Sequence, residues 1–257
     1  MDGGALADAE TTLEGGAVDG GTMPSACGAS LPEATVNANG VLSPFPHIDY
    51  RILTPGFTIV SVNFTLTEDG GSSPLLEMFA EIRNSGTTVE CSFLPDVSLD
   101  FHDIVGLVDT PPFYNEYTTS VTHDCLAPGE IGVIRGVARG VYQADIDTAR
   151  SLTIDIGPNT IGTSTRALDG PLVLRADIIE SASGWVVDGD LSIATTIYNY
   201  GYVALARDYR GVLVDELLAF PAELGTLSGG STVAFTTGAT ACPFDSFVAY
   251  QSWILRP

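Results

Sequence analysis

Histidine is the first residue type of this chain whose placement could support chemistry. His102 is followed by Asp103, and His123 is followed by Asp124. Two such pairs could ligate a metal ion if folding brought them together, whereas His47 stands apart in the sequence. Because an ordinary loop histidine is commoner than a ligand, the histidines leave the question of a metal site open.

Close pairs of acidic residues are the second candidate: Glu68 with Asp69, Asp100 with Asp103, Asp145 with Asp147, and Asp188 with Asp190. Calcium takes several oxygen ligands, which paired aspartates in loops can supply. The chain has 32 acidic residues, however, so close pairs also arise by chance, and the D-x-[DN]-x-[DN]-G calcium loop is missing from the sequence. We therefore predict a solvated acidic surface and no cofactor, with calcium binding as the alternative.

The four cysteines suggest disulfides. A bridge between Cys91 and Cys125 would close a loop of about 34 residues and would stabilise the fold by about 4 kcal/mol in the chain-entropy model. Cys27 and Cys242 would then form a second bridge, tying the N-terminal region to the last strands. The alternative is four reduced thiols in a cytosolic protein. No C-x-x-C spacing is present, so structural zinc is not expected.

Catalysis has no support in the sequence, because no G-x-S-x-G nucleophile elbow occurs. We therefore expect a protein that is not an enzyme. The segment 110–119, "TPPFYNEYTT", is instead a candidate partner-binding loop, with prolines that stiffen it and Phe113, Tyr114 and Tyr117 as aromatic anchors. In the other interpretation these aromatic side chains fold back over a sheet edge.

Charge excludes two kinds of partner. The formal net charge is -22, and all 10 basic residues are arginines. Such a surface repels nucleic acid and anionic lipid headgroups. No apolar run approaches the ~20 residues of a membrane-spanning helix. A mean hydropathy of +0.24 hints that apolar surface contacts another protein, including a second copy of this chain.

Alternation with a period of two predicts an all-β fold. The runs at 60–67 ("VSVNFTLT"), 75–83 ("LLEMFAEIR"), 171–179 ("PLVLRADII") and 191–198 ("LSIATTIY") each place apolar residues on one side of an expected strand. In the second run Leu76, Met78, Ala80 and Ile82 face the core, with Glu77, Glu81 and Arg83 opposite. In the third, Leu172, Leu174, Ala176 and Ile178 share the core side.

Short phrases recur in the same order along the chain. "IRNSG" at 82–86 matches "IYNYG" at 197–201, "GLVD" at 106–109 matches "GVLVD" at 211–215, and "LAPG" at 126–129 matches "LSGG" at 227–230. We interpret this order as an internal duplication, with Asn84 and Asn199 at equivalent turns. The predicted organisation is two domains at 45–156 and 171–257, a linker at 157–170, and a flexible acidic Gly-rich leader at 1–44 that could instead be an ordered arm.

This order of strands and turns resembles that of bacterial and archaeal immunoglobulin-like β-sandwiches, such as the FxLYD and CARDB-type domains of surface proteins. The resemblance implies two tandem sandwiches without a shared catalytic site. We expect from it a non-enzymatic, exported or cell-surface protein in adhesion, display or extracellular assembly, including a filament or surface-layer subunit with leader exchange. The alternative is a calcium-dependent or carbohydrate-binding module.

Overall fold

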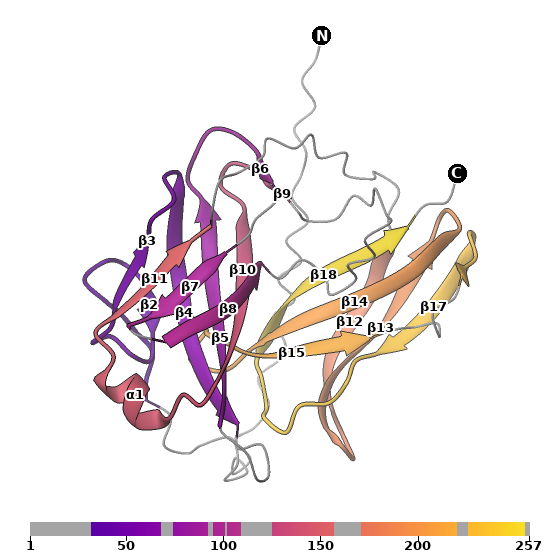
Figure 1. Ribbon diagram of the computed structural model, residues 1–257. Coiled ribbons are helices and arrows are strands. Elements are labelled where there is room, and N and C mark those ends of the chain that lie inside the picture. The colour runs from indigo at the N-terminus through magenta and orange to yellow at the C-terminus, as the bar shows by residue number, and fades with distance from the viewer. Residues whose placement is uncertain are drawn as a thin grey trace.

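The computed structural model describes residues 32–67, 74–91, 95–100, 102–108, 125–156, 171–219 and 226–254 (Figure 1). Most of the described residues lie in strands, and the one helix among them has 6 residues, so the predicted all-β class is confirmed. The expected linker, the aromatic loop and residues 1–31 of the expected leader lie outside these ranges. Among the described residues, no helix has the length and hydropathy to cross a membrane.

The N-terminal unit is a sheet of nine strands in the order β1-β2-β4-β5-β10-β8-β7-β11-β3. The sheet curls around one core, because β3 at its end lies against β4. A short pair, β6 with β9, and the helix α1 (Gln143–Thr148) complete the unit. The strands are β1 Thr35–Val36, β2 Leu42–Ser43, β3 Asp49–Ile52, β4 Phe57–Thr67, β5 Leu75–Asn84, β6 Glu90–Cys91, β7 Asp96–Leu99, β8 His102–Val108, β9 Cys125–Leu126, β10 Ile131–Arg139 and β11 Ser151–Asp155.

The two longest strands of this sheet, β4 and β5, largely follow the predicted alternation on their core side. All four predicted core residues of β5 are fully buried. In β4 a register irregularity lies between Ile59 and Ser61, so Ile59 packs against the core where the simple pattern had placed Val60. An extra residue in one strand puts the side chains before it out of phase with those after it, which explains why Ile59 and not Val60 packs against the core.

The leader boundary at residue 44 falls inside this sheet. Leu42 of β2 pairs in parallel with Ser61 of β4, and Val41 and Ser43 are buried. The Ser43 hydroxyl lies 2.7 Å from the Tyr50 hydroxyl. Residues from 35 onward therefore belong to the N-terminal unit and not to a leader.

The C-terminal unit has two sheets around a second core. One has the order β12-β13-β17, and the other has β14 at its centre, paired with β15, β16 and β18. The strands are β12 Leu172–Ser181, β13 Gly184–Ile193, β14 Ile197–Arg207, β15 Leu213–Ala219, β16 Thr226–Leu227, β17 Ser231–Thr236 and β18 Ser246–Ile254.

The run at 191–198 is two strands and not one, which corrects the sequence prediction. β13 ends at Ile193, and β14 begins at Ile197 in the other sheet. Ile193 and Ile197 both contact the same core, whereas Thr195 between them is exposed. The apolar period continues across the break because both sheets direct their inner side chains into one core.

The repeat phrases are also corrected, because Asn199 lies within β14 and not at a turn. The amide of Gly129 donates to the carbonyl of Asn84 at 2.7 Å, and the amide of Gly230 donates to the carbonyl of Ile193 at 2.6 Å. "LAPG" and "LSGG" therefore form the same turn before β10 and β17, but the residue equivalent to Asn84 is Ile193. The similarity of "IRNSG" and "IYNYG" had paired Asn84 with Asn199, which is the wrong register for the strands that precede these turns.

The two units pack against each other through outer sheet faces, with β15 beside β4 and β5 (Figure 1). Phe79 of β5 is 1% exposed although it points away from the N-terminal core. It belongs to a third apolar cluster, which we call the seam: Phe79, Val133, Val203, Leu205 and Leu213, with Leu218 and Val248 packed against them. Asn63 Nδ2 also donates to the carbonyl of Leu213 at 2.9 Å.

Two ion pairs border the seam, each joining the units. Arg207 Nη1 donates to Glu81 Oε2 at 2.8 Å, and its second nitrogen binds the other oxygen of the same carboxylate. Arg135 Nη1 lies 2.8 Å from Glu216 Oε2, and Arg135 also pairs with Glu77. The Glu81 and Glu216 side chains are only 4% and 6% exposed, so the predicted solvent face of β5 is in fact an interface.

The acids at the seam predict an unusual pH dependence. Burial raises the pKa of Glu216 above its ordinary value of 4.5 and the pKa of Asp215 above 3.8. A raised acid pKa penalises the folded state above that pKa, and the penalty disappears as the pH falls to the ordinary value. Glu216→Gln removes this titration but also the pair with Arg135, so the free energy of unfolding of the variant relative to wild type should rise from pH 4.5 to pH 7 on top of a constant loss from the missing pair.

Urea unfolding between pH 4.5 and pH 7 measures this difference. Glu180→Gln on β12 is the control, because Glu180 is an exposed residue away from the seam. A difference between Glu216→Gln and wild type that stays constant with pH would contradict the prediction.

Candidate functional site

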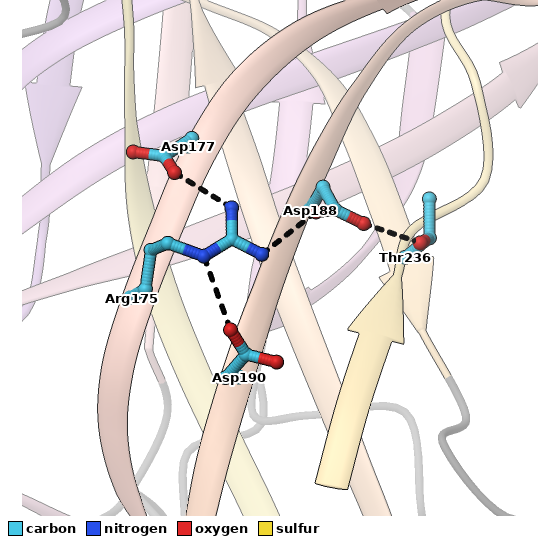
Figure 2. Close-up of polar contacts among 5 residues, drawn as sticks. All are labelled: Arg175, Asp177, Asp188, Asp190 and Thr236. Atoms are coloured by element: carbon cyan, nitrogen blue, oxygen red, sulfur yellow. Dashed lines mark hydrogen bonds and ion pairs between the residues drawn. The ribbon is translucent and has the colours of Figure 1, made fainter.

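A charged network on the C-terminal unit is the candidate site that we assign to the described residues (Figure 2). Arg175 of β12 donates through Nη1 to Asp177 at 2.7 Å, through Nη2 to Asp188 at 2.9 Å and through Nε to Asp190 at 3.1 Å. Thr236 of β17 donates its hydroxyl to the second oxygen of Asp188 at 2.7 Å. One guanidinium is thus surrounded by three carboxylates from two neighbouring strands.

Strand register brings these side chains together. Asp177 lies directly opposite Asp188, and Arg175 lies directly opposite Asp190. Like charges facing each other across two strands are destabilising, whereas an opposite pair is stabilising. Arg175 therefore compensates a repulsion that the register itself creates.

Hydrogen bonding shifts the pKa values of this network. The Thr236 hydroxyl, and then the Arg175 guanidinium, lower the pKa of Asp188. Hydrogen bonds from Arg175 to Asp177, Asp188 and Asp190 raise the pKa of the guanidinium. Both shifts favour the charged forms of Asp188 and Arg175, which strengthens the attraction between these two side chains.

This arrangement limits what the carboxylates can do. Within the described ranges, no group of three or more His, Cys, Asp or Glu side chains is placed to hold a metal ion. In the network, the guanidinium already lies among the aspartates where a cation would neutralise them. The site is therefore a surface patch in which hydrogen bonds hold the charged side chains in fixed positions. Such a patch can contribute to recognition of a charged partner.

Removing the guanidinium should destabilise the C-terminal unit. We expect Arg175→Gln to lower the thermal midpoint, because Asp177 and Asp188 then face each other without a cation. The decrease should be smaller in 1 M NaCl than in 0.05 M NaCl, because salt screens exposed charges. Calorimetry at both salt concentrations measures it.

Arg51→Gln is the matched control, because Arg51 pairs with the single carboxylate of Asp49. The control should change the midpoint less than Arg175→Gln does. An equal decrease at both salt concentrations for Arg175→Gln would contradict the electrostatic explanation.

Apolar side chains are exposed on the same strand as the network. Leu172, Leu174 and Ile179 of β12 are 65%, 54% and 39% exposed. The prediction that Leu172 and Leu174 face the core was wrong, because a register shift between Val173 and Arg175 turns Val173 inward instead. Among the strands that the structure describes, β12 is also at an edge of its sheet.

The other predicted acidic pairs have separate structural contacts or lie outside the described ranges. Asp100 accepts the backbone amides of Arg150 at 2.7 Å and Ser151 at 3.0 Å, and the first of these bonds is the main reason that its pKa is lowered. Asp145 accepts the amide of Tyr142 at 2.8 Å, and Asp147 accepts Gln143 Nε2 at 2.8 Å. Asp103 is exposed on β8, and Glu68 and Asp69 lie outside the described ranges.

The predicted meeting of the two His–Asp pairs stays a prediction, because His123 and Asp124 lie outside the described ranges. His47 Nε2 lies 3.2 Å from the carbonyl of Ile146, beside the helix α1. His102 belongs to β8, whereas His123 lies outside the described ranges, as do Phe113, Tyr114 and Tyr117.

The backbone register places two of the four cysteines opposite each other, so the bridge between Cys91 and Cys125 stays a prediction that this register allows. Cys91 and Cys125 are direct register partners of β6 and β9. Opposite residues of an antiparallel pair have Cα atoms about 4.5–5.5 Å apart, which suits a disulfide. Cys242 is disulfide-bonded. Cys27 lies outside the described ranges, so its pairing with Cys242 stays a prediction.

The seam residues were missed by sequence reasoning, although a signal was present. Phe79 lies on the side of β5 where the alternation places Glu77 and Glu81. A large apolar residue on a charged strand face indicates that a partner covers this face. Val203 and Leu205 give the same signal on β14, where they precede Arg207.

Comparison with known proteins gives no significant match to a protein-family model, a curated protein or a solved structure. The class that the structure itself defines is an all-β protein built from sandwich-like sheets.

Proposed function

We propose that this chain is a non-enzymatic protein of the cell surface or extracellular space, acting in adhesion, display or assembly. We further propose that its two units are immunoglobulin-like sandwiches. The observation that carries the proposal is the seam, which joins the units through buried apolar residues and two interunit ion pairs. Domains in one chain usually move relative to each other unless their interface is large and apolar, so a seam of this kind favours a stiff spacer or assembly unit.

The N-terminal segment adds a further link between the units. Arg210, on the turn between β14 and β15, donates from Nη1 to the carbonyl of Pro32 at 3.1 Å. The Arg210 side chain is only 3% exposed and also pairs with Asp208 at 2.6 Å. The contact between Pro32, at the start of the N-terminal unit, and Arg210 of the C-terminal unit supports the proposal that the two units form one rigid body.

The cysteines support the proposed location. Cys242 is disulfide-bonded, and the register of β6 and β9 places Cys91 opposite Cys125. Disulfides persist in oxidising compartments and are rare in the cytosol. The acidic, lysine-free surface also favours protein partners over nucleic acid.

Two measurements test the proposal. Antibody labelling of intact cells that produce a tagged chain should detect it at the surface or in the medium. Intact-protein mass spectrometry of the purified chain, with and without reductant, should show two disulfides. A chain found only inside the cell with four free thiols would overturn the proposal.

A further inference from the structure

The strand β12 has an edge suited to pairing with another chain. It has 10 residues and pairs with β13 on one side, and within the described ranges no strand pairs with its other side. The free N–H and C=O groups of such an edge form a template for a further strand. Leu172, Leu174 and Ile179 add exposed apolar surface along it.

The opposite edge of the same sheet lacks this combination. β17 has 6 residues, and none of the large apolar residues that are exposed in the described structure lies on it. Three of them lie on β12. Covering β12 with another strand would therefore bury more apolar surface than covering β17 would.

We propose that β12 pairs antiparallel with β12 of a second copy, about a twofold axis at Ala176. Arg175 and Asp177 flank Ala176, so this register places Arg175 of each copy opposite Asp177 of the other. The Ile179 end of one strand then lies beside the Leu172 end of its partner. The strand is thus complementary to itself in charge.

Charge also selects this register over its neighbours. Sliding the strands by two residues in one direction places Arg175 opposite Arg175 of the other copy, and sliding them in the other direction places Asp177 opposite Asp177. Like charges directly opposite each other destabilise a strand pair, whereas the register centred on Ala176 has two opposite-charge pairs.

Charges and bulges on edge strands often prevent pairing, so the arrangement on β12 matters. Its register shift lies between Val173 and Arg175, toward one end of the strand, and β12 pairs with β13 without another irregularity from Arg175 to Ser181. The strand also carries both signs of charge near its centre, where a block of one sign would repel a second copy. The inference rests on the proposed assembly role and names its partner as a second copy.

A pair of charge reversals tests the inference on the full, oxidised chain. Light scattering after size exclusion, in 0.5 M NaCl to screen the net charge of -22, should show the mass rising from 26.9 kDa toward twice that value with concentration. Arg175→Asp alone and Asp177→Arg alone should each weaken association at least tenfold. An equimolar mixture of the two variants should restore it, because the two carboxylates that the first variant carries at these positions then face the two guanidinium groups of the second.

Matched controls and a second variant separate pairing from folding. Arg51→Asp and Asp49→Arg make the same reversals on the exposed pair of β3, another edge strand, and should not change association. Leu174→Asn leaves the ionic network intact and should weaken association without lowering the thermal midpoint. Hydrogen exchange at high concentration should show protection of 172–181.

A chain that stays monomeric at all concentrations would overturn the β12 pairing, and so would a dimer that the reversals leave unchanged. In both cases the proposed surface location could still be found by labelling intact cells. A dimer that the mixture restores, in a chain confined to the cell interior, would support the pairing while overturning the proposed function.

Discussion

Arg207→Met is expected to lower the free energy of unfolding by about 3 kcal/mol or more, because it leaves the buried carboxylate of Glu81 without its cation. The Glu81 side chain is 4% exposed and accepts both a bidentate guanidinium and the Ser61 hydroxyl. The hydroxyl alone cannot neutralise the charge. Because the Arg207 side chain is 21% exposed and water can reach it, we expect the lower part of the range for buried pairs, about 3–5 kcal/mol.

A double-mutant cycle identifies the cause of this loss. Glu81→Met combined with Arg207→Met removes both charges, and replacing a buried pair by apolar side chains of similar volume is often neutral or stabilising. Urea unfolding should therefore place the double variant close to wild type. Arg51→Ala is the surface control, with an expected loss of 0 to about 1 kcal/mol. A double variant as unstable as Arg207→Met would contradict the unpaired-charge explanation.

Phe79→Ala is expected to cost about 3–5 kcal/mol, the typical value for truncating a buried phenylalanine. The ring is 1% exposed and lies in the seam cluster with residues of both units. The cavity therefore forms between the units and not inside one core. The loss should appear as weaker coupling, with two unfolding transitions where wild type shows one.

Hydrogen exchange distinguishes this effect from general destabilisation. Phe79→Ala should increase exchange in β14 and β15 of the C-terminal unit, whose outer side chains lose packing. Phe64→Ala is the matched control, because Phe64 is a buried phenylalanine of the N-terminal core that lies outside the seam cluster. The control should increase exchange in the N-terminal unit first. Identical exchange patterns for both variants would contradict the role of Phe79 at the seam.

These two results bear directly on the proposed role. A spacer or assembly unit transmits force only if its domains do not swing independently. If Arg207 and Phe79 hold the units together as expected, the seam is the feature that converts two sandwich-like units into one body. If both variants leave the coupling intact, this structural support for the proposal is lost.

Much of the strand content could be predicted from the sequence, because alternation is a local property. Leu76, Met78, Ala80 and Ile82 were placed correctly in the core of the N-terminal unit by their spacing alone. The "LAPG" and "LSGG" turns were also matched correctly, because Gly129 and Gly230 both adopt positive φ values, 85° and 78°, that glycine accommodates without strain.

Register irregularities escaped sequence reasoning. The shifts in β4 and β12 move Val60 and Leu172 away from the core. The residue types in these two runs give no sign of the extra residue that causes each shift. The same limit applies to Asn199, whose resemblance to Asn84 is chemical and not positional. Pairing partners determine such shifts, and the partners are distant in the sequence.

The sequence by itself determined the all-β class, the buried side of β5 and the strongly acidic surface, because these follow from side-chain periodicity and composition. Only the tertiary structure decided that the polar side of β5 is an interface and that Arg175 lies among three aspartates. Both features depend on which strands meet, and on burial that one strand cannot create alone. The alternation alone places Glu81 on the solvent side of its strand. In the structure Arg207, 126 positions away in the sequence, binds its carboxylate.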